Sequence, residues 1–91
     1  REIEEVIYTH PKVLEAAVVG VPDEVRGEEV KVYVAGREEQ DVTPEEILEF
    51  LQQRMAKYKW PKEVEILPEL PKGPTGKILK RELKAMATQE G

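Results

Sequence analysis

Two apolar segments joined by a short polar turn constrain the fold of this chain more than any other feature. Residues 13–21 are rich in β-branched and small side chains and end near a glycine and a proline, which is typical of a buried strand. Residues 29–35 alternate in polarity, with Val30, Val32 and Val34 on one face and Lys31 and Tyr33 on the other. With residues 23–27 as a loop, the two segments predict an antiparallel pair.

The remaining segments predict helices and one further strand. Residues 2–10 have helical spacing of apolar side chains, and Pro11 prevents continuation. Thr43, Pro44 and Glu46 form a capping box with a proline at the first helical position, predicting a helix that runs to about Ala56. Residues 63–67 predict a short third strand, and residues 78–87 a final amphipathic helix.

The predicted order is therefore α-β-β-α-β-α. Layer rules convert this order into an α+β fold, a small mixed, mainly antiparallel three-stranded sheet packed with helices. A chain of 91 residues with 40% apolar content fits one domain, so residues 1–91 are expected to form a single unit. Such a domain has no room for a separate substrate-sized cavity, which argues against a complete two-substrate enzyme.

Composition excludes several classes of site. The chain contains no cysteine and no serine, so disulfides, thiolate metal sites and the usual Ser or Cys nucleophiles are excluded. His10 is the one histidine, and without partners it is expected to be structural or solvated rather than a metal ligand. No apolar run approaches the roughly 20 residues that span a bilayer, so we expect no transmembrane segment and a cytoplasmic location.

Charge is distributed unevenly along the chain. Residues 1–56 carry a net charge of −8 and residues 57–84 a net charge of +4. The basic half could meet an anion, although most charge runs are solvated faces. A stand-alone nucleic-acid-binding module is one alternative, but the low pI and the scarcity of interleaved aromatic and basic residues argue against it. We therefore expect no nucleic-acid partner.

The segment around Lys77 must be tested against the phosphate-binding loop GxxxxGK[ST]. It fails that test, because Pro71 stands where the first glycine belongs and Ile78 where the hydroxyl residue belongs. Two glycines and Pro74 instead predict a tight exposed turn that holds Lys77 forward at the edge of the last helix. The turn is therefore expected to present the Lys77 ammonium at the surface.

Residues 71–83, with the sequence PKGPTGKILKREL, match the last signature of adenylate-forming enzymes, especially acyl-CoA ligases. The similarity extends along nearly the whole chain. Residues 1–5 resemble the end of the segment after the interdomain hinge, residues 13–28 the family's β-hairpin, and residues 58–62 its penultimate signature. The chain thus resembles the C-terminal lid domain of the AMP-binding superfamily.

The resemblance implies that the full enzyme adenylates a carboxylic acid with ATP, releases pyrophosphate, and then turns this domain so that coenzyme A attacks the acyl-adenylate. Lys77 matches the lysine that bridges carboxylate and nucleotide, and Gly76 with Lys77 would contact these substrates. ATP with its Mg²⁺ would be held mainly by an N-terminal adenylation domain, the implied partner, and no metal ligand is expected here. The isolated domain is expected to be inactive.

For the second half-reaction the resemblance points to Tyr58, Trp60 and Lys62 as coenzyme A contacts. An aromatic ring can stack on adenine and a lysine can meet phosphate, but these residues could equally cover a core edge. Residues 26–28 are expected to form a turn with a possible interdomain contact. The basic side chains of Lys80, Arg81 and Lys84 are expected to be a solvated helix face near the favourable C-terminal end of the helix dipole.

Another alternative keeps the family but changes the acceptor. Carrier-protein-loading adenylation enzymes and luciferases share this lid. Residues 72–77, with the sequence KGPTGK, favour acyl-CoA ligases, because amino-acid-loading members more often carry Asn before Gly-Lys.

Overall fold

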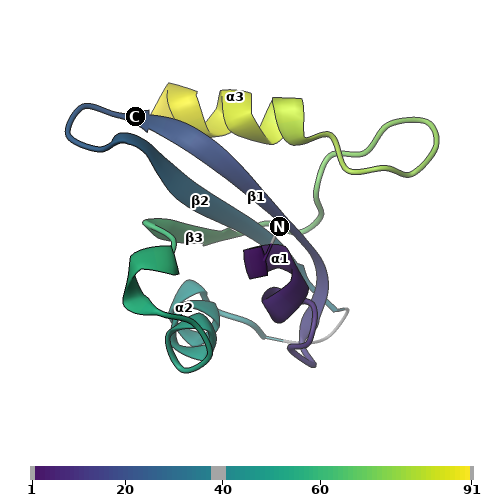
Figure 1. Ribbon diagram of the computed structural model, residues 1–91. Coiled ribbons are helices and arrows are strands. Elements are labelled where there is room, and N and C mark those ends of the chain that lie inside the picture. Colours follow the sequence, from purple (N-terminus) through teal and green to yellow (C-terminus); the bar gives the residue numbers. More distant parts are fainter. Residues whose placement is uncertain (1, 38–40, 91) are drawn as a thin grey trace.

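The computed structural model describes residues 2–37 and 41–90. Within these residues the elements follow the predicted order, with one additional 3₁₀ turn (Figure 1). They are α1 (Glu2–Ile7), β1 (Val13–Asp23), β2 (Gly27–Gly36), α2 (Pro44–Gln52), η1 (Lys57–Lys59), β3 (Glu63–Ile66) and α3 (Lys80–Glu90). The α+β class is confirmed.

The described strands form one mixed sheet in the order β1-β2-β3. β1 and β2 pair antiparallel from Asp23 opposite Gly27 to Val13 opposite Gly36, with an irregularity at Leu14. β3 lies parallel to β2, with Lys31 opposite Glu63. A parallel neighbour requires a crossover connection, and here α2 and η1 supply it. The predicted mixed, mainly antiparallel sheet is confirmed.

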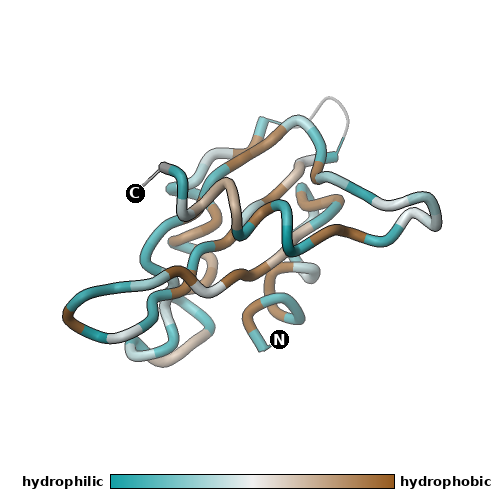
Figure 2. Tube along the Cα trace, turned by 90° about the horizontal axis from the view of Figure 1, so that it is seen from above, coloured by the Kyte–Doolittle hydropathy of each residue, from teal (hydrophilic) through white to brown (hydrophobic). Residues whose placement is uncertain are grey.

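Helices cover both faces of the sheet (Figure 1). Figure 2 shows apolar residues gathered in the central strands and hydrophilic ones on much of the outside. The cluster beneath α1 and α2 has as buried members Ile3, Ile7, Val13, Ala16, Val32, Val34, Ile47, Leu51, Met55 and Val64. The cluster beneath α3 has Ala17, Val19, Tyr33, Ala35, Leu70, Leu83 and Ala87. Successive side chains of β2 point to opposite faces, and both faces of this strand contribute to a core cluster.

The cap of α2 is formed as predicted. The Thr43 hydroxyl accepts the Glu46 N–H at 3.1 Å, and Pro44 occupies the first turn. A hydrogen bond from Lys12 is the main cause that lowers the pKa of Glu46. The helix ends at Gln52 rather than near Ala56, because the chain tightens there and Arg54 N–H bonds Leu51 C=O.

Other boundaries differ from the predictions at turns. The strands run on to Asp23 and from Gly27, so the loop is shorter than residues 23–27. The Asp23 carboxylate accepts the N–H groups of Arg26, at 2.8 Å, and of Val25, at 3.2 Å, which closes the turn within three residues and lowers the pKa of Asp23. α1 ends at Ile7, before Pro11 forces it to, because His10 N–H bonds Ile7 C=O in a tighter turn.

The final helix begins two residues later than predicted. Leu79 N–H still bonds Pro71 C=O, which keeps Leu79 in the preceding loop, so α3 starts at Lys80. Lys80 and Arg81 therefore lie in its first turn, not near its C-terminal end as expected. A positive charge is unfavourable at that end of the helix dipole, and Lys80 is paired there with the Glu4 carboxylate.

His10 is structural, as predicted. It is buried, its Nδ1 accepts the Lys12 N–H at 3.1 Å, and its ring meets the edge of Phe50 at 4.6 Å between centroids. Nε2 lies 3.7 Å from a carboxylate oxygen of Glu46. The histidine thus links the turn after α1 to α2.

Side chains of α1 and of the turn that follows it occupy part of the outer edge of β1. The Tyr8 hydroxyl accepts the Ala16 N–H at 3.0 Å and donates to the Ala16 C=O at 3.1 Å. Two residues further on, Glu4 Oε2 accepts the Val18 N–H at 2.9 Å. These backbone groups face away from β2, so α1 and the turn after it satisfy polar groups that an edge strand otherwise leaves open.

Candidate functional site

Lys77 lies on a hairpin loop that projects from one end of the domain (Figures 1 and 2). A bridge between Lys72 and Ile78 closes the loop, and Gly73 N–H bonds Lys77 C=O at 2.9 Å. At the tip Gly76 N–H returns to Gly73 C=O at 3.0 Å in a four-residue turn with Pro74 at its second position. The predicted tight, exposed turn is confirmed.

Gly76 gives the loop its final change of direction before the lysine. Its φ is +84°, a region that side chains with a Cβ rarely adopt. Lys77 then emerges exposed, and within the described residues its ammonium makes neither a hydrogen bond nor an ion pair. The hydrogen-bonded turn therefore presents an exposed cation.

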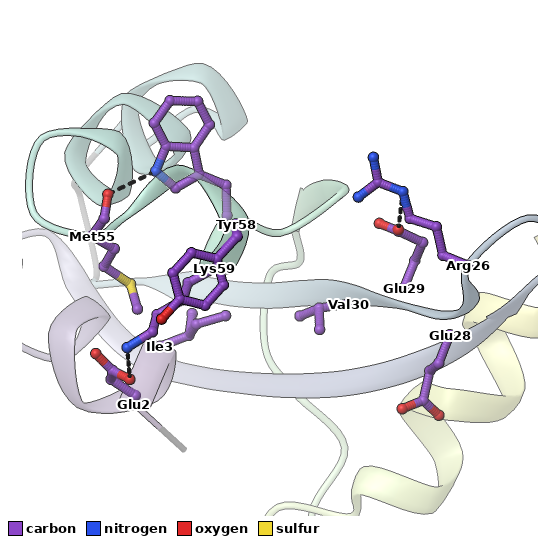
Figure 3. A pocket seen from close by; sticks show the side chains of 10 residues that line it. Glu2, Ile3, Arg26, Glu28, Glu29, Val30, Met55, Tyr58 and Lys59 are labelled. Carbon is purple, nitrogen blue, oxygen red and sulfur yellow. Dashed lines mark hydrogen bonds and ion pairs between the residues drawn. The ribbon is translucent and has the colours of Figure 1, made fainter.

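Tyr58 and Trp60 both line a pocket of about 410 Å³ between α1, η1 and the start of β2 (Figure 3). Tyr58 is 84% exposed and lies on η1. Trp60 packs against the first core cluster, and its indole N–H donates to Met55 C=O at 3.0 Å. The Tyr58 ring is thus largely exposed, with the Lys59 ammonium 5.6 Å from its centroid, while the Trp60 ring is held in place.

Two cations that the sequence did not single out as site residues line the same pocket, Arg26 and Lys59. Lys59 Nζ is 2.8 Å from Glu2 Oε1, a hydrogen bond that raises the pKa of Lys59. Arg26 Nε lies 3.4 Å from Glu29 Oε1 on the hairpin side. The sequence gives no sign that these two cations share a site, because the β1–β2 turn and η1 are far apart in the chain and only folding brings them together.

Lys62 does not share this pocket. Its ammonium lies 3.6 Å from Asp23 Oδ1, and the side chain lines a different depression of about 650 Å³ beside the end of α3. Buried Lys31, 2.9 Å from Glu65, also lines that depression. The structure therefore brings together Tyr58 and Trp60 but not the third predicted contact.

The Lys77 loop and the aromatic pocket lie at opposite ends of the sheet. The loop root contacts Glu15, which stands opposite Ala35 near the end of β2. The pocket is lined by Glu29 and Val30, near the beginning of β2. A strand rises about 3.3 Å per residue, so the stretch from Glu29 to Ala35 spans roughly 20 Å.

Comparison with known proteins assigns the family. The family model of the AMP-binding enzyme C-terminal domain matches residues 2–77. The chain belongs to this family. The match ends at Lys77 and so includes the turn that presents it.

Parts of several complete enzymes resemble this domain closely. A long-chain-fatty-acid CoA ligase of Yersinia pestis is 54% identical over 91% of the chain, which corresponds to 15% of that ligase. ATP-bound MatB from Rhodopseudomonas palustris superimposes with a TM-score of 0.89 at 32% identity, over 98% of this chain and 18% of MatB. A fatty acyl CoA synthetase of Mycobacterium tuberculosis gives 0.86 at 40% identity, again over 98% and 18%. The chain thus spans less than a fifth of the length of these relatives.

Two further observations concern the residues that the structure describes. Within residues 2–37 and 41–90, no three His, Asp or Glu side chains gather closely enough to hold a metal ion. The helices of the same residues include none long and apolar enough to cross a membrane.

Proposed function

We propose that this chain is the mobile C-terminal domain of an AMP-forming acyl-CoA synthetase. Lys77 is the observation that carries the proposal, because a family domain presents this cation on a glycine turn without a described partner. The proposed enzyme joins a carboxylic acid to coenzyme A at the cost of ATP, giving AMP and pyrophosphate. Relatives named as fatty-acid and other CoA ligases support this choice.

In the proposed first half-reaction a carboxylate oxygen attacks the α-phosphorus of ATP, and the bond to pyrophosphate breaks. Negative charge accumulates between the two reactants as they approach. The Lys77 ammonium would lie between carboxylate and nucleotide, and the Gly76 backbone would sit close to them. A preorganised cation in a closed site can contribute about 10²- to 10³-fold in rate.

In the proposed second half-reaction the thiol of coenzyme A attacks the acyl carbonyl, and AMP leaves. Tyr58 would stack on the adenine ring, with Trp60 forming the wall behind it. Arg26 and Lys59 would meet phosphate groups from the two sides of the pocket. Lys62 would contribute only if the ligand extends past Asp23 into the neighbouring depression.

The distance between the two sites supports a domain that turns between the two half-reactions. Lys77 and the aromatic pocket lie roughly 20 Å apart along the sheet, and we propose that a different end of this domain serves each half-reaction. We propose that an N-terminal domain holds the acid, ATP and its Mg²⁺ while this domain alternates. We also propose a cytoplasmic location, because ATP and coenzyme A are cytoplasmic substrates.

The decisive experiment is ATP–pyrophosphate exchange by the complete enzyme with a panel of carboxylic acids, comparing wild type with Lys77→Ala. We expect exchange to fall about 10²-fold or more, while preformed acyl-adenylate is still converted to acyl-CoA. Lys84→Ala is the matched control, since Lys84 is exposed on α3 and its ammonium has no partner in the described structure. Exchange that survives in Lys77→Ala would refute the assignment, and product analysis would identify the acceptor.

A further inference from the structure

Ion pairs attach the Lys77 loop to the sheet at both of its roots. On the N-terminal side Lys72 Nζ lies 2.9 Å from Glu15 Oε2, and it also donates to Leu70 C=O at 3.4 Å. On the C-terminal side Lys80 pairs with Glu4 Oε2. Both carboxylates come from the first part of the chain, on β1 and α1.

Glu4 connects three elements through one oxygen. Oε2 pairs with Lys80 at the start of α3 and accepts the Val18 N–H of β1 at 2.9 Å. Since α1 and α3 cover opposite faces of the sheet, the side chain of Glu4 crosses the edge of β1 to join the two layers. Its side chain is 20% exposed and that of Glu15 is 17% exposed, so both charges are partly shielded from water. Charge-assisted bonds in such places are stronger than open surface pairs.

The loop needs such attachments because its backbone bonds are internal. The hydrogen bonds from Gly73 to Lys77, from Gly76 to Gly73 and from Leu79 to Pro71 all lie within residues 71–79. They fix the shape of the loop but not its direction relative to the sheet. That direction depends on the two roots, which are held by the packing of Leu70 and Ile78 in the second core cluster and by the two ion pairs.

We propose that Glu4 and Glu15 are positioning residues that aim Lys77 into the active site. They act through Lys72 and Lys80 and do not touch a substrate, and the inference rests on the proposed role of Lys77 in adenylation. Displacement of a reacting group by about 1 Å can cost 10²-fold in rate. A loop pinned at both roots keeps that displacement small.

The test uses the complete enzyme with Glu4→Gln and Glu15→Gln, which remove charge and preserve shape. We expect the maximal rate of ATP–pyrophosphate exchange to fall about 10- to 100-fold with little change in the KM for ATP. Conversion of preformed acyl-adenylate to acyl-CoA should not change. The matched control is Glu5→Gln, since Glu5 is the exposed neighbour of Glu4 on α1.

Each variant is also measured in the Lys77→Ala background. A positioning residue that acts through Lys77 has no further effect once the lysine is removed, whereas a merely structural residue still lowers the rate. Equal losses in both half-reactions, a persistent loss in Lys77→Ala, or unchanged exchange in both glutamine variants would overturn the proposal. Should Glu4→Gln fail to fold by circular dichroism, Lys80→Met removes the same pair from the other side.

A second readout does not depend on catalysis. Hydrogen–deuterium exchange of the peptide covering residues 71–79 should become faster in Glu4→Gln and Glu15→Gln but not in Glu5→Gln. If the wild-type enzyme activates no acid and these amides still exchange faster, the proposed function fails while the attachment stands. Unchanged amide exchange means that the glutamates do not hold the loop.

Discussion

Gly76 is the residue on which the direction of Lys77 depends most directly. At φ +84° any residue with a Cβ is strained, although no described atom would lie within 4 Å of an added Cβ. Gly76→Ala should therefore cost about 1–2 kcal/mol of local conformational energy without any steric clash. We expect ATP–pyrophosphate exchange to fall roughly tenfold as the loop relaxes, and the melting temperature of the domain to fall by about 4–8 °C for each kcal/mol of strain that relaxation does not remove.

Gly73→Ala separates backbone strain from the mere loss of a glycine in this loop. Gly73 has no positive φ, and an added Cβ would meet Leu79 at 3.4 Å, close to an ordinary contact. This variant should keep most of the exchange activity. Equal losses at both glycines would mean that the conformation of Gly76 is not what matters.

At the scale of elements, the attachment of α1 to β1 and α3 should depend on pH through Glu4. Partial burial opposes ionisation, but the hydrogen bonds from Lys80 and Val18 hold the pKa of Glu4 below its ordinary value of 4.5. A carboxylate whose pKa is lower in the folded state than in the unfolded state stabilises the fold at pH values above the unfolded-state pKa. This stabilisation is lost as the pH falls through the folded-state pKa. Glu4→Gln should thus be less stable than wild type by about 1–2 kcal/mol at pH 7, and this difference should shrink below pH 4.5.

Urea unfolding of the chain at pH 7 and at pH 3 measures this difference. Glu5→Gln, on the exposed side of α1, should match wild type at both values. A gap between Glu4→Gln and wild type that is the same at both pH values would show that ionisation of Glu4 does not stabilise the fold.

Structural features that depend on neighbouring residues were predictable from the sequence, and features that depend on tertiary contacts were not. The α2 cap and the alternation of β2 follow from neighbouring residues, and both are confirmed. The ends of α2 and α3 depend on hydrogen bonds across turns and loops, such as Leu79 N–H to Pro71 C=O, which periodicity does not report. In the site, the motif identified the Lys77 turn, whereas Arg26 and Lys59 join the aromatic pocket only through folding.

At the scale of the whole molecule, the two ends of the sheet should respond independently to mutation. Tyr58→Ala should raise the apparent KM for coenzyme A about tenfold, since stacking contributes roughly 1–3 kcal/mol per base, and leave ATP–pyrophosphate exchange unchanged. Because Tyr58 is 84% exposed, stability should change by less than about 0.5 kcal/mol. Steady-state kinetics of the complete enzyme measure both effects.

Tyr8 is the comparison for Tyr58, because its hydroxyl is bonded to Ala16 and its ring lies outside the aromatic pocket. Tyr8→Phe should leave the coenzyme A requirement unchanged. If Tyr58→Ala lowered ATP–pyrophosphate exchange by the same factor by which it raised the apparent KM for coenzyme A, the two ends of the sheet would not act separately.

The occupied edge of β1 has a consequence for crowded solutions. A strand with open N–H and C=O groups is a template on which a strand of another molecule can grow into a shared sheet. If this domain alternates as proposed, an open edge would be exposed each time the domain left its neighbour. The Tyr8 hydroxyl at Ala16 and the Glu4 carboxylate at Val18 occupy hydrogen-bonding groups in the middle of this edge, which opposes intermolecular strand pairing there.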